Sequence, residues 1–247
     1  VPVYMLGTPA EMDKICATAA KFNLPVICDA AAAIGAKYKG QHLGELDVFA
    51  TVFSFNGNKT LTCGGGGAVI AKDEKAFSRI NHLATTARVG QGYDHDAVGF
   101  NYRMTNVNAA LGCAQLEQLD QFLEIKRKHA HAYADAIREI DCADAFPSPP
   151  EVQSAHWLSG VILSLSQQQI EACIEGLCAR GIAARPFWKP IHLQAPYKDA
   201  PTTELPVTSS IYQGIIPLPC STSLTDQERE TTIRALRETL VEILETG

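Results

Sequence analysis

Three side chains with complementary chemistry follow two apolar segments of this sequence. Asp29 ends one apolar run, and Ser54 and Lys59 come at the end of a second, within Phe-Ser-Phe-Asn-Gly-Asn-Lys. Four glycines, 64–67, lie just beyond the lysine and let the backbone pass close to another group. A pyridoxal-phosphate site requires these parts: lysine forms the Schiff base, the carboxylate keeps the ring nitrogen protonated and the hydroxyl holds the phosphate.

Each residue also has a simpler interpretation. Asp29 alone is better explained as a helix N-cap, since residues 30–33 could start a turn, and a lone lysine is usually solvated surface. The motifs GxGxxG, GxxxxGK[ST], GxSxG and HExxH are absent, which argues against the commonest dinucleotide, nucleotide-phosphate, serine-hydrolase and zinc-protease sites. A nicotinamide oxidoreductase is disfavoured for the same reason.

The strands and helices that the sequence predicts must position these residues. The capping box of residues 8–11 predicts a helix that runs to about Phe22. Short apolar runs at 24–28, 48–55 and 68–71 are typical of buried strands in a parallel sheet. The order of these elements predicts an α/β fold.

The second half of the sequence has a different pattern. A long helix or helix pair is expected over 105–140, followed by a Pro-rich break at 146–150. Capping boxes at 166–169 and 225–228 begin two further helices, the first stopping at Gly181. Strands are predicted at 161–165 and 182–187. This part is therefore expected to form a small α+β unit.

Composition limits the class of protein. The chain has 247 residues, 46% of them hydrophobic and 19% charged, which is typical of a soluble globular protein. Its net charge of -6 argues against nucleic acid or an anionic membrane as a partner. Eight scattered cysteines suggest free thiols in the cytoplasm rather than a disulfide framework or a metal site.

Several motifs in order resemble one enzyme family over essentially the whole chain. They are the opening segment 2–12, Asp-Ala-Ala-Ala-Ala-Ile-Gly at 29–35 with Tyr-Lys-Gly at 38–40, the lysine segment 53–60, Gly-Phe-Asn-Tyr-Arg-Met at 99–104 and His-Leu-Gln-Ala-Pro-Tyr at 192–197. The sequence is thereby similar to the DegT/StrS-type sugar aminotransferases. Within the family it looks most like the branch that aminates 4-keto-6-deoxy UDP-N-acetyl sugars.

The resemblance implies a role for each matching position. Lys59 matches the Schiff-base lysine, Asp29 the partner of the pyridine nitrogen and Ser54 a phosphate ligand. Asn101 matches an asparagine that reaches the cofactor phosphate of the neighbouring subunit, although it could also be a turn residue. His192 falls near the family's substrate pocket, where a structural histidine is the alternative.

The resemblance also implies an architecture and partners. The expected fold is the aspartate-aminotransferase type (fold type I), a mostly parallel sheet between helices with a small C-terminal domain. Residues 1–125 would be part of the cofactor-binding large domain and residues 126–247 the small domain. Pyridoxal 5'-phosphate would be the cofactor, a keto sugar nucleotide and an amino-acid donor such as glutamate the substrates, and a homodimer the assembly with shared sites.

Two departures from the family support an alternative. Ala32 stands where many members have Gln or His near the cofactor's ring oxygen, and the opening motif normally lies well inside the chain. We therefore expect an N-terminally truncated enzyme, or else a catalytically silent member that acts as a binding or regulatory module.

Overall fold

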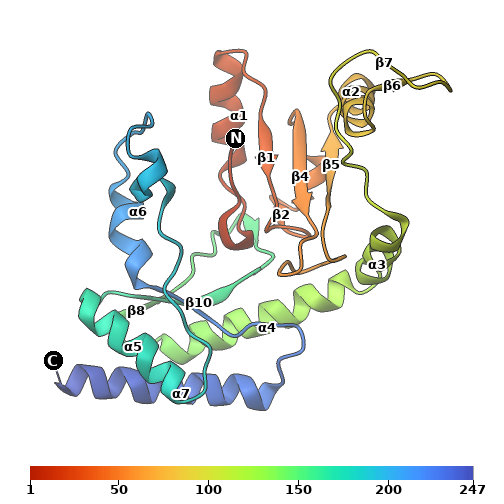
Figure 1. Cartoon of the computed structure of the whole chain (residues 1–247). Helices are drawn as coiled ribbons and strands as arrows, with labels where there is room; N and C mark the ends of the chain where they lie inside the picture. Colours follow the sequence, from red (N-terminus) through yellow and green to blue (C-terminus); the bar gives the residue numbers. More distant parts are fainter. Residues whose placement is uncertain (247) are drawn as a thin grey trace. The chain divides into compact units, whose positions relative to one another are not determined.

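A computed structural model describes residues 1–246, which divide into two compact units (Figure 1). The first unit comprises Val1–Glu124 and Ser148–Trp157, and the second comprises Ile125–Pro147 and the described residues from Leu158 onward. The segment Ser148–Trp157 therefore returns to the first unit after the chain has entered the second.

The first unit is built around a small mixed sheet with the order β1-β4-β5. Strand β1 is parallel to β4, and β4 is antiparallel to β5. The unit also holds two short antiparallel sheets, β3-β2-β9 and β6-β7. Its strands are β1 (Ile27–Asp29), β2 (Lys37–Tyr38), β3 (Gln41–His42), β4 (Ala50–Ser54), β5 (Gly67–Ala71), β6 (Arg88–Val89), β7 (Asp94–His95) and β9 (Val152–Gln153), and its helices are α1 (Met12–Lys21), α2 (Glu74–Ala84) and α3 (Asn106–Leu116).

The predicted α/β class is confirmed, but the strand pairing differs from a mostly parallel sheet. Among the described residues, the only strand-to-strand ladder that runs parallel joins β1 and β4. Strand β5 follows β4 after a loop, residues 55–66, that contains no helix. Because a parallel partner needs a crossover connection, a chain that returns directly from such a loop pairs antiparallel.

Helix α1 begins later than the sequence predicts. Its N-cap is Glu11, without a side-chain hydrogen bond, so the predicted capping box is wrong. The hydroxyl of Thr8 lies 3.0 Å from that of Ser154 instead and joins the opening segment to the returning segment. The core of this unit consists of the buried residues Tyr4, Met12, Cys28, Ala30, Ala33, Ala36, Tyr38, Leu43, Val48 and Ala155.

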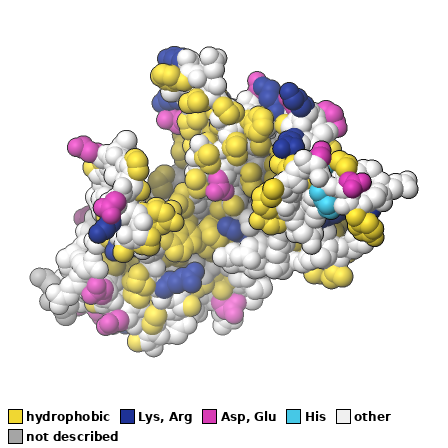
Figure 2. Space-filling model, turned by 45° about the horizontal axis from the view of Figure 1, so that its top comes forward, with side chains coloured by type: hydrophobic (Ala, Val, Ile, Leu, Met, Phe, Trp, Pro, Cys, Tyr) yellow, Lys and Arg dark blue, Asp and Glu magenta, His cyan; other side chains and the backbone are white. Residues whose placement is uncertain are grey.

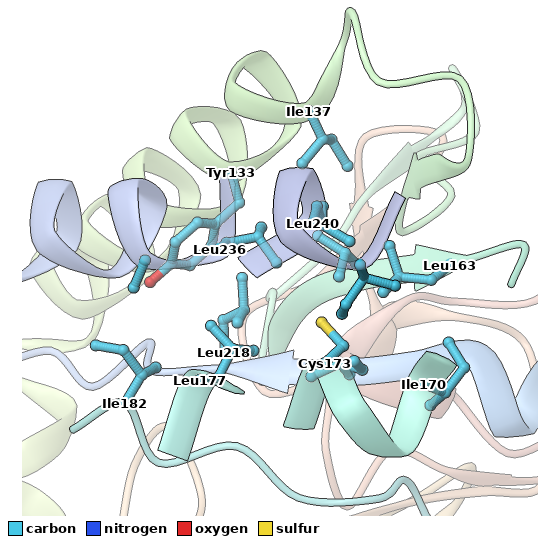
Figure 3. Close-up of a cluster of buried hydrophobic side chains, with 14 residues drawn as sticks. Tyr133, Ile137, Leu163, Ile170, Cys173, Leu177, Ile182, Leu218, Leu236 and Leu240 are labelled. Atoms are coloured by element: carbon cyan, nitrogen blue, oxygen red, sulfur yellow. The ribbon is translucent and has the colours of Figure 1, made fainter. Parts of the chain in front are cut away.

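The second unit is an antiparallel sheet packed against helices. The strand order is β11-β10-β8, with β8 (Ala143–Ala145), β10 (Ser159–Leu163) and β11 (Ile215–Leu218). Its helices are α5 (Gln167–Ala179), α6 (Pro206–Ile211) and α7 (Asp226–Thr246), and α4 (Leu119–Ile137) contributes its greater part. Figure 3 shows side chains from α4, α5, α7 and the sheet meeting in one core, which includes Tyr133, Ile137, Leu163, Ile170, Cys173, Leu177, Ile182, Leu218, Leu236 and Leu240.

Local sequence signals in this unit are mostly confirmed. Ser166 and Gln169 form a reciprocal capping box at the start of α5, and Gly181 follows the helix with φ +78°. A predicted strand at 182–187 is wrong, since these residues pair with no strand. Ile182 is buried in the core directly after α5, so its apolar character serves helix packing rather than a sheet.

Side chains of helix α4 form hydrogen bonds with the segment that connects β11 to α7. Tyr133 Oη, Lys126 Nζ and His129 Nε2 lie 2.5, 3.0 and 3.2 Å from the carbonyl oxygens of residues 219, 220 and 221, respectively. The three donors lie on one face of α4, because residues three, four and seven apart share a helix face. The backbone carbonyls of the three residues that follow β11 thereby form hydrogen bonds with protein side chains rather than with water.

The surface carries many large apolar side chains, visible as yellow patches in Figure 2. Val107 and Leu111 of α3 are 73% and 52% exposed.

The eight cysteines are all free thiols. Within residues 1–246, no helix has the length and apolar character needed to span a bilayer.

Candidate functional site

Asp29 stands at the carboxyl end of β1, beside the end of β4. The register pairs Asp29 with Val52, and Ser54 ends β4 two residues further on. Parallel strands direct their carboxyl ends to the same sheet edge, where α/β proteins bind ligands. The Asp29 carboxylate is half-buried and accepts a hydrogen bond from the Ala31 amide at 3.0 Å. It closes a turn there, but it caps no helix.

Lys59 extends from the loop that joins β4 to β5. This loop is closed by a hydrogen bond from Phe55 N to Gly66 O at 2.9 Å, and a turn brings Lys59 N to within 3.0 Å of Asn56 O. The lysine is half-buried, and burial lowers the pKa of its amine, while the nearby Asp29 carboxylate raises it. The structure thus brings together the amine and the carboxylate that the sequence separates by thirty positions.

A tryptophan completes the surroundings of Lys59. The ammonium nitrogen lies 3.8 Å from the centroid of the Trp157 ring, and the indole N–H donates to Asn58 O at 2.7 Å. Sequence reasoning did not find this residue, because Trp157 lies beyond the Pro-rich break and 99 positions from Asn58. Only the return of Ser148–Trp157 to the first unit places it here.

One face of α3 holds the glycine-rich turn that follows the lysine. Asn108 Nδ2 donates to Cys63 O at 2.6 Å, and Thr62 N donates to Gln115 Oε1 at 3.5 Å. Gly66 has φ +83°, and a Cβ at this position would lie 2.9 Å from Met104 Cε. The turn therefore needs glycine for its backbone conformation, since the Met104 side chain could move away from an added Cβ.

The other predicted site residues lie in different surroundings. Ser54 Oγ accepts from Asn56 N at 3.3 Å, which keeps the hydroxyl at the strand end. Asn101 is exposed and forms an antiparallel bridge with Thr85, in the extended segment between α2 and α3. His192 lies in a short 3-10 helix (Ile191–Leu193) of the second unit, with Nε2 3.2 Å from Ser209 Oγ.

The first unit's donor set fits pyridoxal phosphate in three respects. Because its pKa is lowered, the Lys59 amine is more readily neutral and able to react with an aldehyde carbon. Asp29 supplies an anion at the same sheet edge for a protonated pyridine nitrogen. The buried Thr60 hydroxyl has no partner among the described residues, which leaves a polar atom beside the lysine for a ligand. Ala32 adds no side-chain hydrogen bond. Within the described part of the chain, no group of three His, Cys, Asp or Glu side chains forms a metal site.

Comparison with known sequences identifies relatives over nearly the whole chain. The sequence pattern of the DegT/DnrJ/EryC1/StrS aminotransferase family matches residues 1–237. The chain is 35% identical over 243 residues to EpsN of Bacillus subtilis, which is described as a pyridoxal phosphate-dependent aminotransferase, and covers 62% of that protein. It is 34% identical over 252 residues to a GDP-perosamine synthase of Caulobacter vibrioides and covers 66% of it. The chain thus spans less than two thirds of the length of these relatives, while 96% and 98% of its own residues align.

Solved structures show the same fold. DesV of S. venezuelae, solved in complex with a ketimine intermediate, has a TM-score of 0.87 and 28% identity, with 96% of this chain and 63% of DesV covered. TlmJ, an aminotransferase from Streptoalloteichus hindustanus, has a TM-score of 0.90 at 24% identity and covers 98% of this chain and 65% of its own. The α/β units described above are therefore those of the sugar aminotransferase fold.

Proposed function

The chain belongs to the DegT/DnrJ/EryC1/StrS aminotransferase family, and on this basis we propose that it transfers an amino group from an amino-acid donor to a keto sugar nucleotide. The observation that carries the proposal is the Lys59 amine, half-buried and within electrostatic reach of Asp29 at the sheet edge. A relative named GDP-perosamine synthase supports a nucleotide-linked sugar as the acceptor. We take a 4-keto-6-deoxy sugar as the acceptor and glutamate as the first donor to test.

Pyridoxal phosphate, when bound, supplies the electron sink that makes the α-proton of the donor acidic. Lys59 would hold the cofactor through Nζ and, once released, take the proton from the donor's α-carbon at Nζ and return it in the 1,3-proton shift of transamination. A lowered pKa suits this task, because the amine must be neutral to accept the proton.

The remaining residues would bind and orient the cofactor and substrate. Asp29 would hold the proton on the pyridine nitrogen, with its carboxylate already oriented by the Ala31 amide. Ser54 would donate to the phosphate, and Asn101 would reach the phosphate of a second subunit in a homodimer. His192 would contact the substrate from the small domain. We propose residues 1–125 as part of the cofactor domain and 126–247 as the small domain, except that Ser148–Trp157 returns to the first unit.

The proposal is tested by trapping the cofactor. The purified chain is mixed with pyridoxal phosphate, its visible spectrum is recorded, and the adduct is reduced with borohydride and mapped by peptide mass spectrometry. We expect the pyridoxyl group on Lys59, and its loss in Lys59→Ala. Lys72→Ala is the matched control, because Lys72 is an exposed lysine of the same unit that pairs with Asp47 at 2.6 Å. Labelling spread over surface lysines, or an unchanged specific adduct in Lys59→Ala, would refute the assignment and favour a silent binding module.

A further inference from the structure

Trp157 makes two separate contacts with consecutive residues of the lysine loop. Its indole N–H lies 2.7 Å from Asn58 O, and its ring centroid lies 3.8 Å from Lys59 Nζ. The tryptophan is only 7% exposed, so the ring is not a surface platform for a ligand. We propose that Trp157 is the positioning residue of Lys59: its N–H fixes the peptide that precedes the lysine, and its ring face holds the ammonium until the lysine reacts.

The main chain at Trp157 is itself held by the opening segment of the chain. Trp157 N donates to Leu6 O at 3.0 Å, and Ala155 N donates to Gly7 O at 2.9 Å. Gly7 has φ +93°, and a Cβ there would lie 3.0 Å from Trp157 N. Because the main chain that carries the ring is fixed, only the side chain has to be ordered when the ring meets the lysine.

The contact distinguishes the two protonation states of Lys59. A ring face attracts an ammonium through its quadrupole, and this attraction vanishes when the amine is neutral. The other charged group that faces Lys59 is Asp29, which also favours the ammonium, while burial opposes it. Protonated Lys59 is therefore held over the ring, and loss of the proton frees Nζ to reach a carbonyl carbon. This inference rests on the proposed role of Lys59, but both tests below are made without cofactor.

The first test uses tryptophan fluorescence. The sequence contains two tryptophans, Trp157 and the partly exposed Trp188, so Trp188→Leu leaves Trp157 as the sole tryptophan, which is excited at a wavelength that tyrosine does not absorb. We expect its emission to change through one alkaline transition as Lys59 loses its proton. The transition should disappear in Trp188→Leu with Lys59→Met. The same titration in both variants would overturn the proposal, and this test leaves Trp157 intact.

The second test measures the chemical reactivity of Lys59. The rate of its modification by trinitrobenzenesulfonate is followed by mass spectrometry at a fixed pH below the lysine pKa, where only the neutral amine reacts. A cation–π contact of ordinary strength shifts a protonation equilibrium roughly 2- to 30-fold. We therefore expect Trp157→Leu to react faster by that factor and Trp157→Phe, which keeps a ring but no N–H, to lie between it and the wild type.

Trp188→Leu is the matched control and should react at the wild-type rate. Equal rates in Trp157→Leu, Trp157→Phe and Trp188→Leu would refute the positioning role. If Trp157→Leu does not fold, the fluorescence titration, which keeps Trp157, tests the positioning role instead. A normal titration with no pyridoxyl label on Lys59 would instead contradict the proposed function while leaving the role of Trp157 intact.

Discussion

Asp29→Asn separates the charge of this residue from its local structural role. The carboxylate accepts the Ala31 amide hydrogen bond at 3.0 Å, and an asparagine oxygen can accept the same bond. The main chain of Asp29 is fixed on both sides, with N donating to Pro2 O at 2.9 Å and O accepting from Tyr4 N at 3.0 Å. We therefore expect Asp29→Asn to fold normally and to lose only the negative charge at the sheet edge.

The loss of charge should weaken cofactor binding by a predictable amount. A hydrogen bond to a charged group contributes about 1.5–3 kcal/mol, so the dissociation constant of pyridoxal phosphate should rise roughly 10- to 150-fold. Turnover should fall as well, because the pyridine nitrogen loses the partner that keeps it protonated. The dissociation constant is measured by titrating the visible absorbance of the bound cofactor.

A second readout needs no cofactor. Because Asp29 raises the pKa of Lys59, its removal should lower that pKa further and make the free amine react faster with trinitrobenzenesulfonate at a fixed pH. Asp47→Asn is the matched control, since Asp47 pairs with exposed Lys72. An Asp29→Asn variant that bound the cofactor as tightly as Asp47→Asn would show that the carboxylate does not face the ring nitrogen.

Three further outcomes follow from the described contacts. Tyr133→Phe leaves the part-buried carbonyl of Pro219 without its donor, which should cost about 1–3 kcal/mol and lower Tm by about 2–12 °C in a thermal unfolding scan; an unchanged Tm would contradict this. Burial lowers the pKa of His129 below its usual value of about 6.5. At a pH between the lowered pKa of folded His129 and its ordinary unfolded value, the unfolded state binds more protons, so the free energy of unfolding should fall as pH falls. His129→Gln should reduce this pH dependence, measured by urea unfolding between pH 5 and 7; an equal dependence in both proteins would disprove it. A Cβ on Gly67 would lie 2.3 Å from Phe53 O, so Gly67→Ala should force β5 from β4 and destabilise by about 1–3 kcal/mol, whereas Gly57→Ala, with open space around it, should not; similar urea midpoints for the two variants would count against it.

The parts of the fold that depend on local signals could be predicted from the sequence. Ser166 and Gln169 cap α5 as their spacing indicates, because both partners lie within one helical turn. Thr8 shows the limit of such a signal, since its hydroxyl pairs with Ser154, 146 positions away, and the helix begins without it. A local pattern predicts a cap only where no distant partner competes for the same side chain.

The candidate site likewise contains residues that local patterns predict and one residue that they do not. Asp29 and Lys59 follow apolar strands, and their proximity is a consequence of two strands that end at one sheet edge. Trp157 has no pattern around it that points to Lys59. Its position depends on a chain that leaves the first unit and returns, and no periodicity in the sequence encodes such a path.

The return of Ser148–Trp157 has a consequence for the order of events during synthesis. Residues 1–124 emerge before Trp157 and already contain the β1-β4-β5 sheet, the lysine loop and Asp29. Trp157 emerges later, because α4 and β8 precede it in the chain. Domains tend to fold as they emerge, but the surroundings of Lys59 are completed only when this late segment joins the first unit. The surroundings of Lys59 are therefore incomplete until this segment joins its unit, and before then the amine lacks the ring face that holds its ammonium form.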